Sequence, residues 1–232
     1  MLAVSLGGCS LGGEAGIAAS GSGTNRSYPA QGFTAIGLRG SDDIDVRVGT
    51  GFSVRAEGPS DQLAKVLISK DGDTLQIGRR SSGGFSWSHG DKVKIYVTLP
   101  RLASAVIVGS GTMSVDRVEG TAFSGSIAGS GDLNIATLRV DDADLSIAGS
   151  GDARAAGAVS HLTVDIAGSG SLDAAGLRAA SAAVSVAGSG DVRAAVTGDA
   201  KVNLIGSGDV DLGAEGRCNI SKKGSGSVRC GR

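Results

Sequence analysis

The sequence predicts an all-β protein: a parallel β-solenoid of about seven coils of 18–20 residues, with a β-rich N-terminal lobe continuous with it. Three observations lead to this fold class. Gly-Ser-Gly triplets recur at a nearly fixed spacing, apolar and polar residues alternate on both sides of each triplet, and the chain has 40 glycines but only 3% aromatic residues. The many Val, Ile, Leu and Ala residues argue against low-complexity disorder, because they can bury a core.

The triplets set the period of the coils. Neighbouring triplets begin 18 to 20 residues apart, which is typical of solenoids. We expect each triplet to form a corner, because glycine allows positive φ and close approach of two backbones. The seven triplets begin at Gly109, Gly129, Gly149, Gly168, Gly188, Gly206 and Gly224.

The residues around each triplet predict strands. Positions two, four and six before the first glycine, and four and six after it, are almost wholly apolar, and the positions between them are mostly polar. This period of two is typical of β-strands. Each coil is therefore predicted to contain a strand, a corner, a second strand and a looser return. Crossovers between parallel strands favour the right hand.

One outward column carries alternating charge, five residues after the first glycine. Opposite charges on neighbouring strands attract, and a one-residue slip would turn them into the core, so the column specifies register. Its members are Arg154, Asp173, Arg193, Asp211 and Arg229.

The region before the repeats lacks the triplets. Residues 28–100 contain short alternating runs, which predict a β-rich lobe that covers the open N-terminal edge of the solenoid. The stretch "PSDQLAK" predicts one helical turn within it. The solenoid proper is predicted over residues 101–232.

The first residues, "MLAVSLGGCS", resemble the end of a bacterial lipoprotein signal. Residues 1–9 are interpreted as a truncated signal peptide with a lipobox, and Cys9 as the site of lipid attachment. Residues 10–27 are then expected to be a flexible linker. The alternative is a chance cysteine in a glycine-rich start.

Cys218 and Cys230 lie in inward columns of the last coil, on either side of its corner. We expect a disulfide between them that closes the terminal coil, although two separate buried thiols are the alternative. A disulfide indicates an oxidising compartment outside the cytoplasm.

Candidate binding residues are few. The net charge of −1 argues against nucleic acid as a partner, because phosphate binding needs a basic face. The loop "SSGGFSWSHGDK" groups Phe85, Trp87 and His89, which are candidate ligand contacts because aromatic rings stack on sugars or peptides. The alternative is that the two aromatic rings plug the end of the core.

A row of aspartates follows the triplets directly: Asp132, Asp152, Asp191 and Asp209. It is a candidate cation row, although its spacing fits known calcium-binding solenoid repeats poorly. It also offers carboxylate pairs for a polysaccharide-active enzyme. The simpler alternative is a turn residue that accepts local backbone N–H bonds. No catalytic residue, resident metal or cofactor is predicted.

The order of the motifs "FTAIGLRGSDDIDVRVGTGFSVRAEGPSDQL", "DGDTLQIG", "VKIYVTLPRLASAVIVGSG" and the repeated "GSGD" resembles the bacterial GIN domain family, also called the putative autotransporter adhesin head domain or DUF2807. The resemblance covers about residues 32–232. It implies a β-solenoid without established catalytic residues. We therefore expect a non-catalytic, lipid-anchored protein of the cell envelope, periplasmic or surface-facing, that binds envelope polysaccharide or another envelope protein.

Overall fold

The computed structural model describes residues 16–80 and 92–231, which form an all-β chain. Within these ranges the only helix is the predicted single turn, α1 (Ser60–Leu63). No helix of the described part is long and apolar enough to cross a membrane.

The strands fall into two groups along the chain. The N-terminal group consists of β1 (Asn25–Tyr28), β2 (Ala35–Gly40), β3 (Asp43–Val48), β4 (Ser53–Glu57), β5 (Val66–Asp71), β6 (Thr74–Arg79) and β7 (Lys94–Leu99). The repeat group consists of β8 (Ser104–Gly109), β9 (Thr112–Val115), β10 (Val118–Gly129), β11 (Asp132–Gly149), β12 (Asp152–Gly168), β13 (Ser171–Gly188), β14 (Val192–Val196), β15 (Asp199–Gly206), β16 (Val210–Asp211), β17 (Arg217–Lys223) and β18 (Val228–Arg229).

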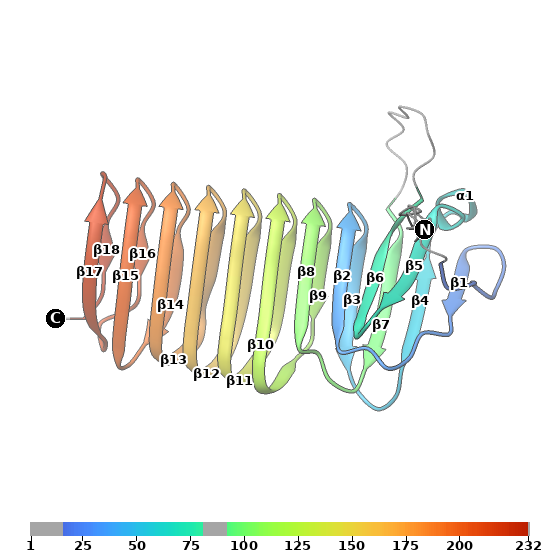
Figure 1. Cartoon of the computed structure of the whole chain (residues 1–232), viewed down its shortest axis with the longest axis horizontal. Helices are drawn as coiled ribbons and strands as arrows, with labels where there is room; N and C mark the ends of the chain where they lie inside the picture. Colours follow the sequence, from blue (N-terminus) through green and yellow to red (C-terminus); the bar gives the residue numbers. More distant parts are fainter. Residues whose placement is uncertain (1–15, 81–91, 232) are drawn as a thin grey trace, which may run out of the picture.

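From β8 onward the coils stack side by side in parallel along the long axis of the molecule (Figure 1). Gly129 lies in register with Gly109 of the preceding coil and Gly149 of the next, so the corners form one ridge. The predicted inward columns face the core, where Ile107 and Ile127 are at most 1% exposed. The predicted parallel β-solenoid is confirmed.

Each corner depends on both of its glycines. Gly129 has a φ of 127°, a conformation that L side chains rarely adopt. A Cβ atom added to Gly131 would lie 2.6 Å from the carbonyl oxygen of Gly111 in the preceding coil. The first glycine therefore supplies the turn, and both glycines allow the neighbouring coils to approach closely.

One coil has a different corner, and the triplet pattern does not reveal it. Strands β2 and β3 pair in parallel with β8 and β9, and Gly40 lies beside Gly109 with a φ of 124°. The second glycine is replaced by Asp42, whose carboxylate is fully buried. It accepts hydrogen bonds from Arg79 Nε (2.9 Å) and from the backbone N–H of Val93 (3.2 Å).

The lobe continues the stack beyond this coil and then closes it. Strand β6 runs parallel to β2, and β7 runs parallel to β3, so these later strands form the next layer outward. Strands β5, β4 and β1 add antiparallel pairings that cover the N-terminal end (Figure 1). The expected lobe, continuous with the solenoid, is therefore present, and it protects an edge that would otherwise invite aggregation.

The expectation of a flexible linker over residues 10–27 is corrected from residue 16 onward. The backbone N–H of Ile17 donates a 2.7 Å hydrogen bond to the carbonyl of Ile68, and its side chain packs against the core. Residues 25–28 form β1, and Tyr28 is buried. This segment belongs to the lobe because Ile17 and Tyr28 bury apolar surface against it.

The C-terminal end is closed differently. The predicted disulfide between Cys218 and Cys230 is present, with a Cα–Cα distance of 6.2 Å. Lys222 occupies a column that is apolar in the other coils, and its ammonium group donates a 2.8 Å hydrogen bond to the carbonyl of Gly226. Ile220 is left 45% exposed because no further coil covers it.

Candidate binding face

The stack has two long faces of different character. We call the outward side of the strands that lead into the corners the front face, and that of the strands that follow the corners the back face. The half of the front face next to the corners is here called its upper half. Its outward-facing side chains lie one and three residues before the first glycine of each triplet. In the first six coils these residues are Val106, Val108, Ser126, Ala128, Ser146, Ala148, Asp165, Ala167, Ser185, Ala187, Asn203 and Ile205.

This half of the front face carries mostly small side chains and is nearly uncharged. Asp165 is its only ionisable residue across those six coils. Val108 and Ile205, near its two ends, are 46% and 60% exposed, although large aliphatic residues are usually buried.

Between these two bulky residues the front face is hollowed. An open groove of about 310 Å³, here called the upper groove, runs across β10 to β13. Its floor is low because the exposed positions are occupied by alanine and serine. The lining residues include Ser126, Ala128, Ser146, Ala148, Asp165, Ala167, Ser185 and Ala187.

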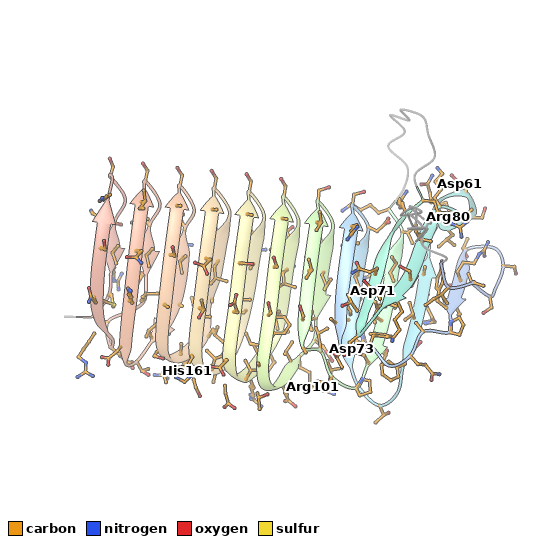
Figure 2. The ribbon with its side chains drawn as sticks, in the orientation of Figure 1. Asp61, Asp71, Asp73, Arg80, Arg101 and His161 are labelled. Carbon is orange, nitrogen blue, oxygen red and sulfur yellow. A yellow bond between two sulfur atoms is a disulfide. The ribbon has the colours of Figure 1, made fainter. Side chains whose placement is uncertain are left out.

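A second groove of about 330 Å³, the lower groove, lies on the same strands farther from the corners. It combines charged and apolar groups. His161 Nδ1 lies 3.2 Å from Asp142 Oδ1 on the neighbouring coil, and both side chains are exposed. Arg101 and His161 lie at the edge of the stack opposite the corners (Figure 2). The lining residues are Arg101, Ala103, Ala122, Phe123, Ser124, Asp142, Ala143, Asp144, His161 and Thr163.

The back face is charged, as the alternating column predicts. Asp173 lies in register between Arg154 and Arg193, and Asp211 lies in register with Arg229 at an N–O distance of 3.5 Å. Such exposed pairs contribute little stability each. The back face therefore presents charged side chains along its length, whereas the upper half of the front face carries only Asp165.

The aspartate row at the corners bonds mainly to the backbone of the next coil. Asp152 Oδ1 accepts from the N–H of Ser171, and Asp191 Oδ1 accepts from the N–H of Asp209. Asp209 Oδ1 accepts from both the N–H and the hydroxyl of Ser227, and these hydrogen bonds lower the pKa of Asp209. These bonds join neighbouring coils, so the carboxylates stabilise the stacking of the corners rather than a turn within one coil.

Among residues 16–80 and 92–231, no group of three His, Cys, Asp or Glu side chains is arranged to hold a metal ion. The candidate cation row therefore gains no support from this geometry and stays a prediction.

The other predicted site residues have mixed outcomes. Cys9, Phe85, Trp87 and His89 lie outside the described residues, so their roles stay predictions.

The lower groove was not predicted from the sequence because its polar residues come from different coils. The signal for the front face was present in the sequence, as alanine recurs directly before the triplet in four coils.

Solved structures share this architecture. A protein described as a putative adhesin from Bacteroides fragilis is 21% identical, with a TM-score of 0.80 over 89% of this chain and 95% of that chain. A protein described as a putative lipid binding protein from Parabacteroides distasonis is 22% identical, with a TM-score of 0.69 over 90% and 96% of the two chains. At this identity the likeness concerns the fold.

A third structure, described as a putative adhesin from Parabacteroides merdae, is 16% identical, with a TM-score of 0.67 over 90% of this chain and 96% of that chain. Among curated proteins, none matches the chain. The family model described as "Putative auto-transporter adhesin, head GIN domain" (DUF2807) matches residues 32–216. The chain therefore belongs to the GIN domain family, as the order of its sequence motifs indicated.

Proposed function

We propose that this protein is a non-catalytic binding module of the bacterial cell envelope, held to a membrane by a lipid on Cys9, which binds an envelope component through its front face. The observation that carries the proposal is the contrast between the two faces. The upper half of the front face has small side chains, contains a groove and is almost uncharged. The back face presents alternating charges.

The physical argument concerns the desolvation that accompanies binding. Covering the back face would remove several charged side chains from water, which is costly unless a partner pairs each of them. Covering the upper front face removes mainly alanine methyl groups and serine hydroxyls, with Asp165 as the single charge. The exposed Val108 and Ile205 would gain from the same contact.

The location outside the cytoplasm rests on separate observations. The Cys218–Cys230 disulfide fits an oxidising compartment. The lipobox-like sequence ends at Cys9. Two of the similar structures are described as putative adhesins and one as a putative lipid binding protein, which agrees with a binding role at a bacterial envelope.

A sedimentation assay tests the proposed face. The purified protein is mixed with the envelope fraction of the bacterium that encodes it, and the bound share is measured after centrifugation. Ala148→Glu places a charge in the upper groove and is expected to reduce the bound share several-fold. Ala136→Glu is the matched control, because Ala136 is also exposed and lies on the same strand, β11, outside both grooves.

The outcomes are distinct. Strong binding by wild type and by Ala136→Glu, with loss in Ala148→Glu, supports the proposal. Absence of wild-type binding, or equal binding by both variants, refutes it. The anchor is tested separately by the intact mass of the protein expressed behind a bacterial lipoprotein signal peptide that ends at Cys9. A mass increase from acyl chains is expected, and Cys9→Ser should abolish it.

A further inference from the structure

The lower groove differs from the rest of the front face because it gathers ionisable groups from separate coils. Arg101 precedes β8, Asp142 and Asp144 are on β11, and His161 is on β12. These residues are far apart in sequence and are brought together only by the stacking of coils. The two hydroxyl side chains of the groove are Ser124 and Thr163.

These groups suit a ligand rich in hydroxyl groups. The carboxylates of Asp142 and Asp144 accept hydrogen bonds, the guanidinium of Arg101 donates them, and hydroxyl side chains do both. Hydrogen bonds to charged partners are the stronger ones. The two carboxylates of Asp142 and Asp144 offset the guanidinium of Arg101, so the groove offers no net positive charge to anionic ligands such as phosphates and uronates.

The groove also has an apolar floor. Ala103, Ala122 and Ala143 line it beside Phe123, which is 2% exposed. A pyranose ring presents C–H groups on its faces and hydroxyl groups around its rim. An apolar floor with polar groups around it matches that distribution, as ligand grooves commonly do.

The lower groove continues into the upper one. Ser124 and Ser126 are successive outward positions of β10, and Asp144 and Ser146 are successive outward positions of β11. The path from Asp142 to Ala148 spans six residues of extended strand, about 20 Å. A chain of several sugar rings can therefore lie along the strands across both grooves.

We propose that the lower groove binds a neutral oligosaccharide built of hexopyranose units, with Asp142 and Asp144 accepting from its hydroxyl groups and Arg101 donating to them. This inference rests on the proposed function, since it names the ligand class of the same face. It concerns binding alone and includes no chemical step.

Isothermal titration calorimetry at millimolar saccharide tests it. The probes are cellohexaose, laminarihexaose, maltohexaose and chitohexaose, with oligogalacturonate as the anionic comparison. We expect at least one neutral probe to bind wild-type protein and oligogalacturonate to bind more weakly. Asp142→Ala should weaken binding about tenfold or more, as for a lost hydrogen bond to a charged group.

Asp199→Ala is the matched control. Asp199 is exposed, pairs with Arg217 at 2.9 Å, and lies seven residues before its corner glycine, as Asp142 does, but outside both grooves. The inference is overturned if no neutral probe binds, if oligogalacturonate binds as tightly as the best neutral probe, or if both variants lose affinity equally. If no saccharide binds but the envelope fraction still binds in an Ala148-dependent way, the ligand class is wrong and the proposed function stands.

Discussion

Replacing single corner glycines by alanine separates two requirements of a corner: a positive φ, and space for the close approach of the neighbouring coil. Gly129→Ala adds a methyl group to a residue with a φ of 127°, and this methyl would lie closer than 3.0 Å to the carbonyl oxygen of Gly109. The Cβ atom added by Gly131→Ala would lie 2.6 Å from the carbonyl oxygen of Gly111, but Gly131 does not have a positive φ. Gly40→Ala has a φ of 124° but no described atom within 4 Å of its added Cβ.

The three variants therefore differ in whether they add backbone strain, a steric clash with the neighbouring coil, or both. A non-glycine residue held at such a φ costs about 1–3 kcal/mol, which is the expected loss for Gly40→Ala. Forcing a methyl group into a closed contact costs about 1–3 kcal/mol, which is the expected loss for Gly131→Ala. Gly129→Ala carries both terms, so its free energy of unfolding should fall by about 2–6 kcal/mol.

Urea unfolding followed by circular dichroism in the β-sheet region measures these losses. The expected order of destabilisation is Gly129→Ala first, with Gly40→Ala and Gly131→Ala each well below it. The reasoning is refuted if Gly40→Ala destabilises the protein as much as Gly129→Ala, since stacking would then contribute nothing. A neutral Gly131→Ala would equally contradict the close approach of the coils.

Three further predictions concern the two ends and the corner row. Replacing both Cys218 and Cys230 by serine should lower the free energy of unfolding by about 3 kcal/mol, because the unfolded chain would no longer be held in a loop with a sequence separation of 12. An unchanged urea midpoint would contradict this. Asp42→Ala leaves the partly buried Arg79 without its carboxylate, so a loss of about 3 kcal/mol is expected in the same assay, and a loss below 1 kcal/mol would contradict it. The lowered pKa of Asp209 adds stability above its ordinary value near 3.8, and this stability is lost as pH falls through the lower folded value. Asp209→Asn should therefore be less stable than wild type at pH 6, and the difference should shrink as the pH falls below 3.8. A difference that stays constant as the pH falls would contradict the assignment.

The repeat region was predictable because one pattern recurs in most coils. Glycine at the corner, an aliphatic residue two before it, and a polar residue three before it specify turn, core and surface together, as at Gly149, Ile147 and Ser146. Consistent local signals of this kind determine a fold with little ambiguity. The disulfide followed because both cysteines occupy inward columns of the last coil.

The lobe was harder to predict because its spatial order differs from its chain order. The β6–β7 layer is later in sequence than β2 and β3 but lies outside them, and nothing local indicates this. The coil with the Gly40-Ser41-Asp42 corner was missed because Asp42 replaces the second glycine, and its side chain is accommodated by Arg79 and Val93. The lower groove likewise depends on contacts between coils, as between Asp142 and His161.

The most direct test of the binding face is to locate the contact itself. Single cysteines are introduced as Ala148→Cys on the front face and Ala136→Cys outside both grooves, at two exposed positions of β11. Their rates of reaction with a maleimide are then measured with and without the envelope fraction. The proposed function predicts that the envelope fraction slows modification at position 148 severalfold and leaves position 136 unchanged. Protection at position 136 alone, or at neither position while the protein is bound, would show that another surface makes the contact.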